Sequence, residues 1–141
     1  MNILIAPLLA AIIAQIVKLL ISMPTKPLRV GSFFKYSGMP SAHSAMMVAL
    51  VVILFLEEGI HSPLFAISLI LTIIVIRDAL GIRRYLGQHG KTLNILVGNL
   101  KDDKVLEQRY PKLLENIGHT PAQVLIGSLI GITIGIIIYL I

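Results

Sequence analysis

Four apolar segments constrain this chain more than any other feature of its sequence. They run over residues 2–21, 41–58, 64–80 and 121–141. About 20 helical residues cross a hydrocarbon core of about 30 Å. The chain is 56% hydrophobic and 13% charged, whereas a soluble domain has about 25% charged residues. The sequence therefore predicts an all-α polytopic membrane protein, a helical bundle with four transmembrane spans in a single domain over residues 1–141.

The one long polar region, residues 85–118, separates the third apolar segment from the fourth. Residues 92–100 have the composition of a short helix lying on the domain. Charges at helical spacing follow over residues 102–109, and Pro111 interrupts them. We therefore expect short interfacial helices in this region.

Charge predicts how the spans are oriented. If the spans alternate in direction, all 12 Lys and Arg residues lie on, or within a turn or two of, one membrane face. Basic residues in short loops favour the cytoplasm, so we expect that face to be cytoplasmic in a bacterial membrane, with both termini outside. The net charge of +5 then concerns orientation and anionic lipids, not nucleic acid. The chain has no cysteine, which excludes disulfides and thiolate metal sites.

Two histidines stand where apolar segments begin. His43 lies in Gly38-Met39-Pro40-Ser41-Ala42-His43-Ser44-Ala45, and His119 lies in Gly118-His119-Thr120-Pro121. Free N–H groups at a helix start attract anions, and histidine titrates near neutral pH. Alternating spans bring both segments to the same face. They are the main functional candidates.

Hydroxyl and cationic side chains are expected at the same face. Arg77 is notable because it sits inside an apolar run, where a charge is expensive and usually functional. Three interpretations fit such a set: phosphate-ester chemistry, anion binding without catalysis, and structural polar packing. The candidate phosphate-binding residues are Ser41, Thr120, Lys26, Arg29, Arg77, Arg83 and Arg84.

The two histidine segments resemble motifs of a known superfamily. Pro40-Ser41-Ala42-His43 resembles the Pro-Ser-Gly-His motif of the type 2 phosphatidic acid phosphatase superfamily, which also contains the vanadium haloperoxidases. The stretch from Gly118 to Gly127 resembles its last motif, in which an aspartate follows a histidine by four residues. Nearly the whole chain, including residues 77–84, is similar to the divergent branch of that superfamily.

The resemblance implies roles for four residues. His119 would be the nucleophile that forms a phosphohistidine, and His43 the general acid that protonates the leaving group. Ser41 would help to hold the phosphate. Gln123 stands where the superfamily has the aspartate that orients the nucleophile. A neutral amide could fix the imidazole tautomer but could not stabilise an imidazolium by charge.

Two basic elements of the superfamily are missing. The motif Lys-six residues-Arg-Pro is absent in that spacing, and Leu113 stands where an arginine is expected before the nucleophile. We expect a cluster of guanidinium groups from another helix to replace them, with Asp78 paired to one of them or to a histidine. The cluster consists of Arg77, Arg83 and Arg84, with Lys26 and Arg29 nearby.

Three glycines, Gly127, Gly131 and Gly135, form one stripe along the last span because they recur every four residues. Small stripes let membrane helices approach closely. The stripe could serve packing within the chain or a homo-oligomer.

The expected function is a metal-independent phosphatase or phosphotransferase for a lipid-linked phosphate or diphosphate, with a phosphohistidine intermediate. We expect no cofactor, although phosphate or vanadate could occupy the site, and the histidine spacings match no metal motif. The alternative is a non-catalytic membrane protein whose anion pocket binds lipid headgroups or a partner. A transporter ranks behind both, because the chain is short and has no inverted repeat.

Overall fold

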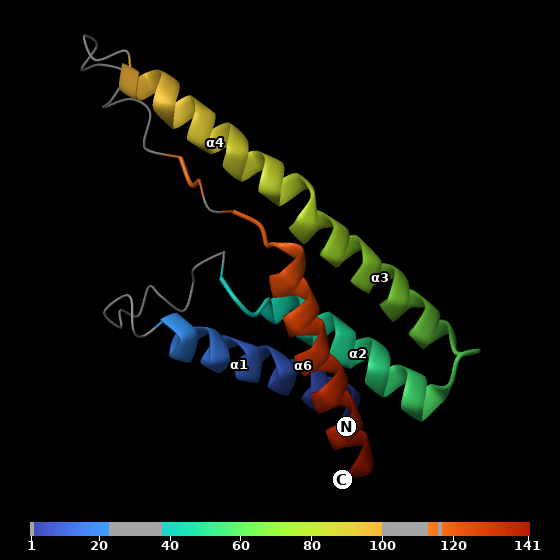
Figure 1. The fold of residues 1–141 in the computed structure, drawn as a ribbon. Coiled ribbons are helices and arrows are strands. Elements are labelled where there is room, and N and C mark those ends of the chain that lie inside the picture. Colours follow the sequence, from blue (N-terminus) through green and yellow to red (C-terminus); the bar gives the residue numbers. More distant parts are fainter. Residues whose placement is uncertain (1, 23–37, 100–112, 116) are drawn as a thin grey trace.

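The structure is a computed structural model that describes residues 2–22, 38–99, 113–115 and 117–141. Within this part of the chain every regular element is an α-helix (Figure 1). The helices are α1 (Asn2–Ser22), α2 (Ala42–Glu58), α3 (Pro63–Leu80), α4 (Ile82–Asn99) and α6 (Pro121–Leu140). The all-α prediction is thus confirmed for the described residues.

Helix α2 is the centre of the bundle. It packs against α1, α3 and α6, and α1 also packs against α6. Helix α3 lies beside α2, and α4 continues from α3 away from the other helices (Figure 1). Helices α1, α3 and α6 therefore all contact α2.

Small residues allow this close packing. The buried positions of α1 are mainly alanines at helical spacing, and Ala45 and Ala49 on α2 are also fully buried. The glycine stripe of α6 faces them: a β-carbon on Gly131 would collide with the carbonyl oxygen of Ala45, and one on Gly127 with that of Ser41. The stripe therefore packs within the chain. A homo-oligomer stays a prediction.

Three helices are long and apolar enough to cross a membrane: Asn2–Ile21, the stretch Pro63–Gly98 and Pro121–Leu140. Helix α2 has 17 residues, which corresponds to about 25 Å, somewhat less than a core of about 30 Å. The prediction of an integral membrane bundle is supported at this level. The fourth span stays a prediction.

The polar region after α3 differs from expectation. Helix α4 begins at Ile82, before the region we expected to be polar, and has 18 residues. Its length follows from the absence of proline between Ile82 and Asn99. Two of its glycines admit a neighbouring segment, since a β-carbon on Gly87 would meet the carbonyl oxygen of Glu115 and one on Gly90 that of Leu114. The expected helix over 102–109 lies outside the described residues.

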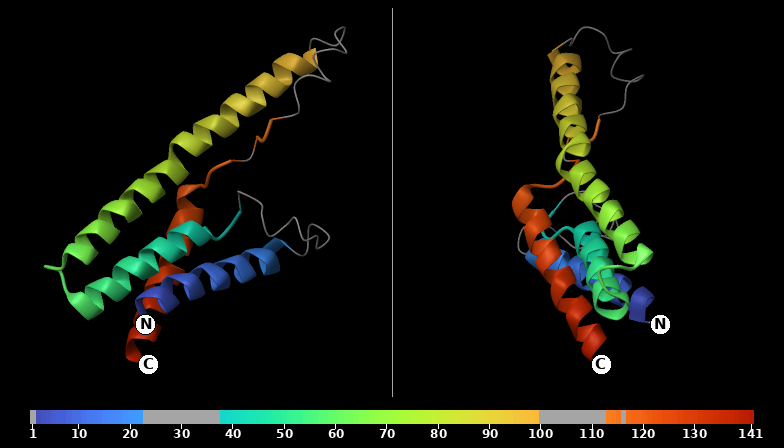
Figure 2. Two further views of the ribbon diagram at one scale, coloured as in Figure 1. Left: turned by 180° about the vertical axis from the view of Figure 1, so that it is seen from behind. Right: turned by 90° about the vertical axis from the view of Figure 1, so that its right-hand side faces the viewer.

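The chain direction alternates between neighbouring spans, so their ends gather in two groups. The termini lie toward one end of the bundle, together with the connection between α2 and α3, in both views of Figure 2. The end of α1, the start of α2, the end of α3 and the start of α6 lie toward the other end. Ser41, His43 and His119 belong to this second group, because they lie at the starts of α2 and α6.

Candidate functional site

The starts of α2 and α6 are joined directly. The main-chain N–H of Ser41 donates a hydrogen bond of 3.1 Å to the carbonyl oxygen of Gln123. Gly127, one turn further along α6, lies against the carbonyl group of Ser41. This contact holds the segments that carry His43 and His119 side by side, as the sequence analysis predicted.

A second contact fixes His119 against the end of α3. Its main-chain N–H donates a hydrogen bond of 3.1 Å to the carbonyl oxygen of Ala79. Gly118 precedes it with φ +96°, and a β-carbon there would come within 2.8 Å of the main-chain nitrogen of Arg84. Only glycine suits both the left-handed backbone and the narrow passage. The imidazole is thus positioned by α3, α4 and α6 together.

The His119 side chain is buried, with 8% of its residue surface exposed. Its Nδ1 atom has no hydrogen-bond partner among the residues that the structure describes. Burial lowers the pKa of His119 below its ordinary value of 6.5, and the positive charges of Lys18, His43 and Arg83 lower it further. The imidazole is therefore kept neutral in surroundings that favour negative charge.

Lys18 is the site residue that the sequence analysis did not select. It lies in the last turn and a half of α1 and is half-buried. Its charge acts on His119, and a β-carbon on Gly38 would come within 2.7 Å of Lys18 Cε. The signal was present in the sequence: Lys18 is a charge within an apolar span, the criterion that singled out Arg77.

His43 and Ser41 sit at the start of α2 in different environments. His43 is exposed in the first turn. Ser41 is fully buried, and its hydroxyl oxygen accepts hydrogen bonds from the Ser44 main chain at 3.3 Å and the Ser44 hydroxyl at 2.9 Å. This is the N-cap arrangement, which satisfies free N–H groups of the helix. The phosphate contact expected for Ser41 stays a prediction.

Thr120 and Gln123 also cap a helix. The Gln123 side-chain oxygen accepts a hydrogen bond of 3.0 Å from the Thr120 N–H, and the Thr120 hydroxyl accepts one of 3.4 Å from the Gln123 N–H. The pair is a capping box at the start of α6. Gln123 therefore does not make the bond to the His119 imidazole that we expected, because its carbonyl group is used by the helix start.

The predicted arginine cluster is divided. Arg83 pairs with Asp78 through Nε and Oδ2 at 2.6 Å, which confirms that Asp78 pairs with one of the arginines. The charge of Arg83 also lowers the pKa of His119, whereas Arg84 is exposed. Arg77 lines a hollow on α3. Lys26 and Arg29 lie outside the described residues.

The arrangement suits an anion more than any other ligand. The buried imidazole of His119 is acted on by the charges of Lys18, His43 and Arg83, and the starts of two helices lie side by side. Helix starts and guanidinium groups both favour phosphate oxygens. A tetrahedral oxyanion would reduce the repulsion between Lys18 and Arg83.

Comparisons with known proteins agree with this description. The model of the family described as Divergent PAP2 family matches residues 1–134. A Bacillus subtilis (strain 168) protein named uncharacterized membrane protein YuiD is 36% identical to this chain over an alignment of 145 positions. The alignment covers 96% of this chain and 92% of that protein. No solved structure matches the chain. Both similarities include the His43 and His119 segments.

Proposed function

Since the chain belongs to the Divergent PAP2 family, we propose that it removes or transfers the phosphoryl group of a lipid-linked phosphate or diphosphate. The observation that supports this proposal most strongly is the environment of His119. Its imidazole is buried, its Nδ1 atom lacks a partner among the described residues, and the charges acting on it are all positive. A buried polar atom without a partner is rare in structural packing alone.

The proposed reaction has two steps. The Nε2 atom of His119 attacks phosphorus, and the bond between phosphorus and the lipid oxygen breaks while His43 gives a proton to that oxygen. Water then attacks the phosphohistidine, the phosphorus–nitrogen bond breaks, and His43 takes a proton from the water. Nε2 is the attacking atom because Nδ1 is inaccessible. A lowered pKa keeps His119 in the neutral, nucleophilic form.

Lys18 and Arg83 would stabilise the phosphoryl oxygens. Both are close enough to influence the His119 pKa, and they come from α1 and α4. Together these two cations would take the place of the superfamily's basic motif, which the sequence lacks. Preorganised charge of this kind is usually the largest contribution to catalysis of phosphoryl transfer.

The apolar helices around the site support a lipid substrate. The end of α1, the end of α3 and the start of α6 border long apolar helices, which supports a site at a membrane interface. The basic bias of the loops supports a cytoplasmic position. An impermeant thiol reagent should label Glu58→Cys in intact cells and leave Lys101→Cys unlabelled; the reverse pattern would refute this orientation.

The second candidate is a non-catalytic anion-binding protein. It is favoured by the capping bond of Gln123, which leaves the nucleophile without its orienting partner. Such a protein would bind a lipid headgroup at the same cations and release no phosphate.

Phosphate release by the purified protein from a panel of isoprenyl and glycerolipid phosphates distinguishes the two. We expect turnover that His119→Ala abolishes and that His61→Ala preserves, because His61 lies in the exposed connection between α2 and α3. Binding of inorganic phosphate without turnover on any lipid would favour the non-catalytic candidate.

A further inference from the structure

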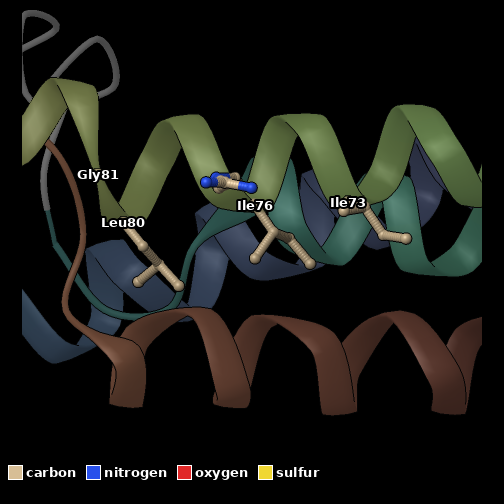
Figure 3. A pocket seen from close by; sticks show the side chains of 5 residues that line it. Ile73, Ile76, Leu80 and Gly81 are labelled. Atoms are coloured by element: carbon tan, nitrogen blue, oxygen red, sulfur yellow. The ribbon is translucent and has the colours of Figure 1, made fainter.

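A hollow on α3 adjoins the candidate site. It is an open hollow of about 410 Å³. We call it the α3 hollow; it is lined by Ile73, Ile76, Arg77, Leu80 and Gly81. These residues recur at helical spacing and form one stripe on α3, and Figure 3 shows Ile76 and Leu80 pointing toward α6.

The hollow leads to His119. Leu80 and Gly81 line the end of the hollow at the C-terminus of α3, and they directly follow Ala79. The Ala79 carbonyl oxygen accepts the hydrogen bond from the main-chain N–H of His119. A molecule bound at His119 and extending along α3 toward the membrane interior would therefore run into the hollow. The α3 hollow and His119 are thus linked through neighbouring residues at the end of α3.

The length of the hollow matches one leaflet. From Ile73 to Gly81 the helix rises about 12 Å, and half of a hydrocarbon core measures about 15 Å. Three of the lining side chains are aliphatic, and a lipid chain that starts at the interface must pass through this depth.

Arg77 gives the hollow one charged edge. A long cationic side chain on a membrane helix keeps its stem among apolar groups and extends its head toward the interface. From Arg77 that direction is toward Gly81 and the candidate site, where a charged headgroup would lie. The α3 hollow thus combines an apolar surface, which suits a hydrocarbon chain, with a cation at the end nearer the candidate site.

We propose that the α3 hollow binds the hydrocarbon chain of the lipid whose phosphate reacts at His119. This inference rests on the proposed function and specifies it: the substrate is recognised by its chain as well as by its phosphate, so long-chain phosphates are preferred to short-chain ones. The hydrocarbon chain anchors the lipid in the α3 hollow, and the phosphorus is placed at the imidazole of His119.

The test compares hexadecyl phosphate with butyl phosphate, assayed in the same mixed micelles. Ile76→Trp fills the hollow and should raise the KM for hexadecyl phosphate about tenfold, while kcat/KM for butyl phosphate stays within about twofold of the wild type. Ile74→Trp is the matched control, since Ile74 lies on α3, is 57% exposed and is not part of the hollow. It should leave both substrates unaffected.

The outcomes separate this inference from the proposed function. If Ile76→Trp behaves like Ile74→Trp, or weakens both substrates equally, the chain does not bind in the α3 hollow. If the wild type releases phosphate from neither ester, the proposed function fails, and this inference fails with it. Hexadecyl phosphate carrying a diazirine on its chain supplies a second measurement on the wild type: label should appear between Ile73 and Gly81, and label confined to other helices would overturn the inference.

Discussion

The main-chain N–H of His119 donates a hydrogen bond of 3.1 Å to the carbonyl oxygen of Ala79, which joins the start of α6 to the end of α3. The last carbonyl groups of a helix have no partner within it, so this bond satisfies one of them. It also brings His119 to Ala79, the residue before Leu80 and Gly81 of the α3 hollow. The position of the imidazole therefore depends on α3 as much as on α6.

The pKa of His119 should rise when a neighbouring cation is removed. Lys18→Met deletes a positive charge that disfavours the imidazolium, so the imidazole will protonate at a higher pH than in the wild type. The rising limb of kcat/KM should then move to higher pH, because only the neutral imidazole attacks phosphorus. NMR titration of labelled histidines, with His119→Asn for assignment, measures the shift directly.

Lys91→Met is the control for this prediction, since Lys91 is exposed on α4 and does not contribute to the His119 pKa. It should leave the titration unchanged. An unchanged or lowered His119 pKa in Lys18→Met would contradict the inference that the charge of Lys18 lowers this pKa.

Packing of the glycine stripe predicts an asymmetry between two Gly→Ala changes. A β-carbon on Gly131 collides with the Ala45 carbonyl oxygen, so Gly131→Ala should destabilise the protein by about 1–3 kcal/mol. Gly98→Ala on α4 meets open space and should stabilise it by about 0.5–1 kcal/mol. Thermal unfolding in detergent compares them, and equal effects would argue against tight packing of α2 on α6.

The identity of residue 123 should set the rate. Gln123→Asp offers a carboxylate that can accept the Nδ1–H of His119 and stabilise the imidazolium that forms, so we expect faster turnover. Gln123→Asn has the same length as aspartate without the charge. If both variants match the wild type, orientation of the imidazole does not limit the reaction.

Helix starts and charge positions were predictable from the sequence. The placement of His43 and His119 at one end of the bundle follows from apolar segments of membrane length that alternate in direction. The pairing of Asp78 with an arginine was also anticipated, and Arg83 is the partner. These features depend on residue type and spacing alone.

Other parts of the site could not be predicted, because the sequence either gives no indication of them or fits two interpretations. Ser41, Thr120 and Gln123 are residue types that bind phosphate and also cap helices, and the structure uses all three for capping. The bond between His119 and Ala79 joins two main chains, so no side chain could indicate it. Lys18 did carry a signal, but its proximity to His119 depends on how α1 packs.

The central claim is that His119 becomes phosphorylated, and the most direct measurement is to trap that intermediate. The His43→Ala variant should be mixed with a phosphate ester of an acidic phenol, which needs no proton for its leaving group. Without His43 to activate water, the phosphoryl group should accumulate, and peptide mapping by mass spectrometry should find an acid-labile phosphoryl group on His119. Phosphorylation of another residue, or release of the phenol with no phosphorylated protein at any time, would contradict the account.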